Sequence, residues 1–192
     1  MKVVAFNGSP RKKGNTYHLL QLVIAELEKE GIETELVHLP DLKLQPCMAC
    51  FKCAKAKNMK CMGGQGDGIN EAIAKMMEAD GILIGTPTHF ANVSGHVKNL
   101  IDRAGIVSKM NGNAMARKVG AAVVAVRRAG AVAAFDAVNR FFQINGMIVP
   151  GAIYWNLGIG LDPGDALKDE EGLRTMADLG ANMAWLLKKL AQ

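Results

Sequence analysis

The feature that most constrains this chain is its opening segment, where a short apolar run leads at once into a polar loop and a helix. Val3 to Phe6 has the length and β-branched character of a strand that is buried on both faces. Gly8-Ser9-Pro10 ends it, because glycine accepts unusual backbone angles and proline donates no ladder hydrogen bond. Asn15 or Thr16 is expected to cap the following helix, in which apolar residues recur at helical spacing at Leu19, Leu20, Val23, Ile24 and Leu27.

This arrangement predicts an anion site in the loop 8–16. Free backbone N–H groups and the positive end of the helix dipole both point into such a loop. Ser9, Asn15 and Thr16 add neutral donors, and Arg11 adds charge at the rim. The loop matches neither Gly-x-Gly-x-x-Gly nor the Gly-Lys-Ser/Thr of nucleotide triphosphatases. Its low fixed charge favours a terminal phosphomonoester over a diphosphate, with an ordinary polar loop as the alternative.

The size and composition of the chain favour a single globular domain spanning residues 1–192. Apolar residues make up 49% and charged residues 21% of the sequence. No apolar run approaches the roughly 20 residues of a membrane span, and basic residues interrupt the start where a signal peptide would stay apolar. We therefore expect a cytoplasmic protein that does not bind membranes. The net charge of +5 comes from scattered residues, and aromatics are only 5%, so no nucleic-acid partner is expected.

Strands and helices alternate along the rest of the chain. Further strands are predicted at 33–38, 81–86 and 119–126, with a fifth opening at 147–150. The first helix is predicted to end near residue 31. Further helices are predicted at 69–79, 95–103, 132–145 and 170–190. This alternation indicates an α/β three-layer sandwich around a five-stranded parallel sheet. A cysteine-rich loop is inserted at about 41–67, and its run 62–68 has the most flexible composition.

Three loops at the carboxyl ends of the predicted strands carry unusual chemistry: 8–16, 87–95 and 127–130. In open parallel sheets, ligands bind at these ends, beside the point where the strand order reverses. A planar apolar ring can lie along the second and third loops while its phosphate fills the first. That ligand description matches flavin mononucleotide (FMN).

All four cysteines of the chain fall within fifteen residues, at Cys47, Cys50, Cys53 and Cys61. Without a secretory signal, this concentration favours metal ligation or redox chemistry over a disulfide scaffold. Four thiolates are the number that a [4Fe–4S] cluster requires, and nearby lysines would favour thiolates. A zinc site, a Cys-x-x-Cys dithiol switch and a set of free thiols are the alternatives.

These motifs resemble those of one family. The loop 8–16 looks like the phosphate loop of the flavodoxin-like NAD(P)H-dependent FMN reductases. Gly85 to Gly95, followed by Lys98 to Arg103, resembles the second flavin loop of that family and its following helix. The cysteine spacing resembles the compact motif of its iron–sulfur flavoprotein branch. The resemblance covers nearly the whole chain and implies a flavodoxin-like fold.

The resemblance also implies roles for individual residues. The FMN phosphate would be bound by Ser9, Arg11, Asn15 and Thr16. The ring and ribityl chain would be lined or bordered by Pro87, Thr88, His89, Phe90, Asn92, Ser94, Gly95, Arg127, Arg128 and Gly130. The family usually has tyrosine at the position of His89; histidine can still stack, and it titrates near neutral pH.

The expected function is an FMN-dependent oxidoreductase of the iron–sulfur flavoprotein type. The cofactors would carry out the electron chemistry, so no catalytic nucleophile or acid–base pair is expected. The partners would be ferredoxin or a small-molecule electron acceptor, and the resemblance implies a homodimer or homotetramer. Two alternatives stay open: a cluster-free reductase that passes electrons from NAD(P)H to FMN and a quinone, and a non-enzymatic redox or metal sensor.

Other residues are given structural roles. Asp102 and Arg103 are expected to form an ion pair at a helix end or an oligomer contact. His18, His38 and His96 are expected at the surface or within helices.

Overall fold

The structure, a computed structural model, describes residues 1–63 and 66–192. Its centre is a sheet of five parallel strands in the order β2-β1-β3-β4-β5. The strands are β1 (Lys2–Asn7), β2 (Glu33–His38), β3 (Gly81–Pro87), β4 (Val119–Val126) and β5 (Leu157–Ile159). The fold is therefore the predicted flavodoxin-like α/β sandwich.

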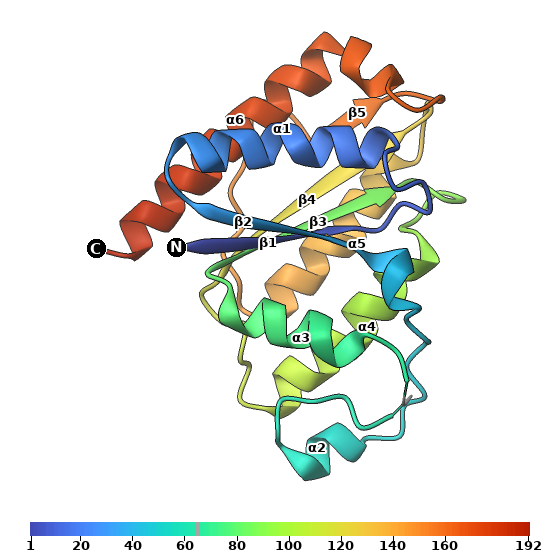
Figure 1. The fold of residues 1–192 in the computed structure, drawn as a ribbon, viewed down its shortest axis with the longest axis vertical. Coiled ribbons are helices and arrows are strands. Elements are labelled where there is room, and N and C mark those ends of the chain that lie inside the picture. Colours follow the sequence, from blue (N-terminus) through green and yellow to red (C-terminus); the bar gives the residue numbers. More distant parts are fainter. Residues whose placement is uncertain (64–65) are drawn as a thin grey trace.

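Helices cover both faces of this sheet (Figure 1). One face carries α1 (Asn15–Lys29) and α6 (Glu170–Leu190), and the other carries α3 (Ile69–Glu78), α4 (Gly95–Met110) and α5 (Ala131–Ile144). Successive side chains of a strand point to opposite faces. Val3 and Ala5 of β1 accordingly join the core under α1 and α6, whereas Val4 and Phe6 join the core under the other three helices.

Three short helices complete the fold: η1 (Leu39–Leu42), α2 (Lys52–Ala56) and η2 (Asp165–Lys168). The segment with α2 extends beyond the ends of α3 and α4, below the sheet in Figure 1. It corresponds to the predicted insertion, of which residues 64 and 65 lie outside the described residues. In the rest of the chain, no helix combines the length and apolar character needed to cross a membrane.

Two predicted boundaries are wrong. The helix expected at 95–103 continues to Met110, because Gly105 lies against the Phe141 ring of α5 and so serves close helix packing instead of a turn. The fifth strand lies at Leu157–Ile159 and not at 147–150. Ile148 makes only an isolated bridge to Val119, and Pro150 has no N–H to extend a ladder.

Candidate functional site

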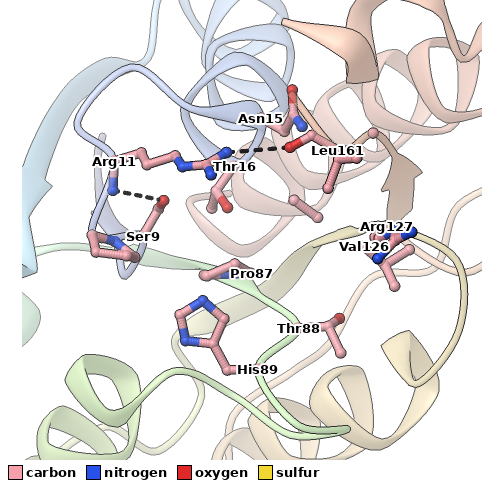
Figure 2. Close-up of a pocket in the computed structure, with 13 residues that line it drawn as sticks. Ser9, Arg11, Asn15, Thr16, Pro87, Thr88, His89, Val126, Arg127 and Leu161 are labelled. Carbon is pink, nitrogen blue, oxygen red and sulfur yellow. Dashed lines mark hydrogen bonds between the residues drawn. The ribbon is translucent and has the colours of Figure 1, made fainter. Parts of the chain in front are cut away.

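A cavity of about 320 Å³ opens at the carboxyl ends of the central strands. It lies where the strand order reverses around β1 and β3, the position at which open α/β sheets bind ligands. Figure 2 shows that side chains from the three predicted loops face it, together with the segment after β5. Its lining residues are Ser9, Pro10, Arg11, Asn15, Thr16, Pro87, Thr88, His89, Ala125, Val126, Arg127, Gly160 and Leu161.

The first loop is folded by its own side chains. Asn7, the last residue of β1, accepts a hydrogen bond from the Ser9 backbone N–H at 3.0 Å and donates to the Lys12 carbonyl at 3.2 Å. Ser9 Oγ accepts from the Arg11 N–H at 3.1 Å. The Arg11 guanidinium reaches across the cavity mouth to the Leu161 carbonyl at 3.2 Å (Figure 2). These hydrogen bonds fix the shape of the loop.

The N-terminus of α1 faces the cavity without a side-chain cap. Gly14 occupies the N-cap position, so the expectation that Asn15 or Thr16 caps the helix is wrong. Asn15 Oδ1 instead accepts hydrogen bonds from the N–H groups of Gly164 and Ala166, at 2.9 and 3.2 Å. Thr16 Oγ1 is buried and has no partner among the described residues. The helix end therefore offers free donors to an anion.

The second loop contains a strained turn. The backbones of His89 and Asn92 exchange two hydrogen bonds, at 2.9 and 3.0 Å. Between them, Phe90 and Ala91 have φ values of 45° and 61°, a left-handed conformation that is costly for such residues. Phe90 is fully exposed at the tip. Thr88 Oγ1, like Thr16 Oγ1, is buried without a described partner at the cavity wall.

Other predicted residues hold the loops together without lining the cavity. Ser94 is fully buried, accepts from the Val97 N–H at the start of α4 and donates to the Gly8 carbonyl at 2.7 Å. Gly130 has φ +88°, and a Cβ there would lie 3.1 Å from the Ala91 Cα, so the third loop abuts the second. The predicted residues that do not line the cavity are Phe90, Asn92, Ser94, Gly95, Arg128 and Gly130.

A second, small cavity gathers all four cysteines. Cys47, Cys50, Cys53 and Cys61 line a space of about 10 Å³ next to Arg103 of α4. The loop around them is strained, since four residues other than glycine have left-handed backbones: Ala49, Phe51, Lys57 and Met59. Burial, followed by the neighbouring Cys61 and Cys50 thiols, raises the pKa of the Cys53 thiol.

Arg103 lies beneath this cysteine loop with only 1% of its surface exposed. Its Nε donates to Cys61 Sγ at 3.3 Å, and its terminal nitrogens bind the Gly63 carbonyl at 2.6 Å and the Asp67 carboxylate. Burial disfavours the charged form, but the contacts with Asp67 and Cys61 outweigh it and raise the pKa of Arg103. The expected pair with Asp102 is wrong, because Asp102 binds Lys98 at the surface.

Cys61 is also held through its backbone. Its N–H donates to Asn70 Oδ1 at 2.7 Å, and Asn70 Nδ2 donates to the Cys61 carbonyl at 3.1 Å. The most distant cysteine in sequence is therefore fixed by α3 and α4 together. Among the described residues, no three acidic, histidine or cysteine side chains are arranged to hold one metal ion. Four thiols are the number of protein ligands that a [4Fe–4S] cluster would take.

The comparisons with known proteins agree with this geometry. A family model described as NADPH-dependent FMN reductase matches residues 1–162. The chain belongs to this family. An iron-sulfur flavoprotein of Methanocaldococcus jannaschii is 37% identical to it, with 98% of each chain aligned. Another, of Archaeoglobus fulgidus, is 35% identical over 98% of this chain and 92% of its own. The predicted iron–sulfur flavoprotein branch is confirmed.

Solved structures support the fold of this FMN reductase family member. RosB, in a structure with bound 8-demethyl-8-formylriboflavin-5'-phosphate, has a TM-score of 0.77 at 19% identity, covering 100% of this chain and 80% of its own. A flavodoxin from the domain Archaea has a TM-score of 0.64 at 18% identity, covering 98% and 99%. Both share the flavodoxin-like sandwich.

The residues of the larger cavity fit the FMN of this family. The buried hydroxyls of Thr16 and Thr88 lack described partners, and the uncapped α1 end suits a phosphate. Arg11 and Arg127 supply positive charge at the lining. The protein is a flavin-dependent oxidoreductase, and bound FMN supplies the electron chemistry that side chains cannot.

Sequence reasoning missed several residues of both sites. Asn7 could have been found, since asparagine at a strand end commonly folds the following turn through its side chain. Gly160 and Leu161 were missed because the fifth strand was expected ten residues earlier. Asn70 and Arg103 carry no sequence signal for cysteine binding, since their contacts depend on how α3 and α4 pack.

Proposed function

We propose that the four cysteines bind a [4Fe–4S] cluster and that the protein passes electrons between FMN, this cluster and an external donor or acceptor. The observation that carries this proposal is that all four cysteines line one cavity above a buried arginine. The names of the curated relatives point the same way.

The chain's own residues supply what such a cluster needs. Four thiolates are its usual ligands. Arg103 places a buried cation next to one of them, at 3.3 Å from Cys61 Sγ. Asn70 fixes the Cys61 backbone, so one ligand is positioned before assembly. The segment 47–53 supplies the other three from a loop that includes the exposed Cys50.

A cluster-free reductase that uses NAD(P)H to reduce FMN and then a quinone or other acceptor is the second candidate. The observation that favours it is the size of the cysteine cavity, because about 10 Å³ holds no more than one water molecule. For the cluster to bind, the segment 47–53 must move outward from Arg103.

The deciding experiment is purification without oxygen, followed by the absorption spectrum and by iron, sulfide and FMN analysis. We expect about four irons and four sulfides per chain. The Cys61→Ser variant should lose most of the iron and keep the FMN. FMN without iron in the unaltered protein would overturn the cluster and leave the cluster-free reductase.

For the partners, we infer a ferredoxin or a small-molecule electron acceptor, a homodimer or homotetramer, and a cytoplasmic location. Large exposed side chains at Phe90, Tyr154 and Trp155 support subunit association, since such groups are enriched at interfaces. Light scattering of the purified protein tests the oligomer, and turnover with NADH, NADPH or reduced ferredoxin tests the donor.

A further inference from the structure

Ser9 of the first loop is held from outside the cavity by His38, the last residue of β2. His38 Nε2 lies 2.9 Å from the Ser9 carbonyl oxygen. Because a carbonyl oxygen can only accept, Nε2 carries the hydrogen and donates it. His38 does not line the cavity, so the Ser9 carbonyl is directed away from the space where an anion would bind.

The sheet itself places His38 at this position. In the parallel register of β1 and β2, His38 pairs with Asn7. Asn7 accepts the Ser9 N–H, and His38 donates to the Ser9 carbonyl. Two neighbouring strand ends therefore hold both backbone groups of one loop residue.

A carboxylate lies beside the other ring nitrogen, Nδ1, which makes no hydrogen bond among the described residues. Asp41 of η1 lies with Oδ1 3.1 Å from His38 Nδ1, and its other oxygen binds Lys12 Nζ at 2.8 Å. Lys12 belongs to the same loop as Ser9, so the Asp41 carboxylate lies between that loop and the imidazole ring. The His38 side chain is only 11% exposed, which limits competition from water.

We propose that His38 is a positioning residue for the FMN phosphate, and thereby sets the preference of this protein for FMN over riboflavin. A carbonyl oxygen turned into the loop would repel a phosphate dianion, since both carry negative charge. The hydrogen bond from His38 keeps that oxygen turned outward and leaves the uncapped α1 end and the buried Thr16 hydroxyl toward the phosphate. Riboflavin has no phosphate, so its binding does not depend on this orientation. This inference goes beyond the proposed function, because it involves neither the cysteines nor an electron partner.

The test compares the affinities of the full-length, flavin-free protein for FMN and riboflavin, measured by flavin fluorescence. His38→Leu removes the donor, and His38→Gln retains one at a similar distance without a titratable ring. We expect His38→Leu to weaken FMN binding about tenfold and to change riboflavin binding less than about twofold. His38→Gln should retain most of the FMN affinity.

Three results would overturn the proposal. Equal losses for both flavins would mean general damage to the pocket. Selective loss of FMN in both variants would mean that the hydrogen bond from position 38 is not what matters. If neither variant loses affinity for FMN, His38 has no role in FMN binding. If His38→Leu does not fold, the surface variant Asp41→Asn replaces it. We expect that variant to lose about threefold in affinity for FMN and none for riboflavin. An equal loss of riboflavin affinity, or no loss of FMN affinity, would again overturn the proposal. None of these results depends on iron content.

Discussion

The Nε–H of Arg103 donates to the sulfur of Cys61 at 3.3 Å, joining the middle of α4 to the last cysteine of the segment 47–61. The same guanidinium binds the Asp67 carboxylate and the Gln45 and Gly63 carbonyls. One buried cation thus ties together both ends of the cysteine segment.

Arg103→Lys should reduce both stability and iron binding. Lysine keeps the charge but not the planar fork that reaches the sulfur and two carbonyls at once. We expect a loss of about 3 kcal/mol in the free energy of unfolding, measured with urea, and less iron per chain at unchanged FMN content. Arg140→Lys is the matched control, because Arg140 forms a surface pair with Asp136 and the change should cost under about 0.5 kcal/mol. Equal behaviour of the two variants would contradict the role of Arg103.

Thr16→Val should weaken FMN binding without destabilising the flavin-free protein. Valine keeps the methyl group and removes a buried hydroxyl that has no described partner. Because a hydrogen bond to a charged group is worth about 1.5–3 kcal/mol, we expect a loss of FMN affinity of about tenfold or more, with riboflavin unaffected. Fluorescence titration measures both, and unchanged FMN affinity would show that this hydroxyl does not meet the phosphate.

Gly8→Ala should destabilise the protein by steric overlap. A Cβ at this position would lie 2.2 Å from Val97 Cγ2 and 3.0 Å from the Gly85 carbonyl oxygen. Overpacking of this kind costs about 1–3 kcal/mol, readable from thermal or urea unfolding. Val97→Ala in the same chain removes one of these contacts, so the double variant should be more stable than the sum of the single losses predicts. If the two stability losses simply add in the double variant, the clash with Val97 is not the cause of the destabilisation by Gly8→Ala.

Acidification should weaken the protein through His96. Burial, and then the nearby His38 and His89, lower the pKa of His96 from its ordinary 6.5. The unfolded chain then takes up this proton more readily than the folded chain, so stability falls as the pH drops below about 6.5. His96→Gln should reduce the difference in unfolding free energy between about pH 7.5 and about pH 5.5. If the variant keeps the full difference, other groups cause it.

The His96 result also bears on how the histidines are arranged. His96 was expected at the surface or within a helix, and it lies in α4. The structure also brings it near His38 of β2 and His89 of the second loop, which its spacing in the sequence did not indicate. Their elements are far apart in the chain and meet only at the carboxyl edge of the sheet.

The sequence by itself determined the architecture and the position of the flavin site. Apolar runs such as 119–126 have no polar side to expose to solvent, so they form strands that helices cover on both faces of the sheet. Parallel strands bring their carboxyl ends to one edge, so the loops after β1, β3 and β4 had to converge. These properties follow from local composition and from chain direction alone.

Only the tertiary structure decided which side chains do which task. Asn15 binds a turn 149 to 151 residues away, Ser94 holds the first loop, and Arg103 lies under the cysteines. Each of these contacts joins elements that are distant in sequence, and its partner is chosen by the packing of helices on the sheet. The spacing of residues along the sequence does not indicate how helices pack on the sheet. The site residues could therefore be predicted from the sequence, but their contacts could not.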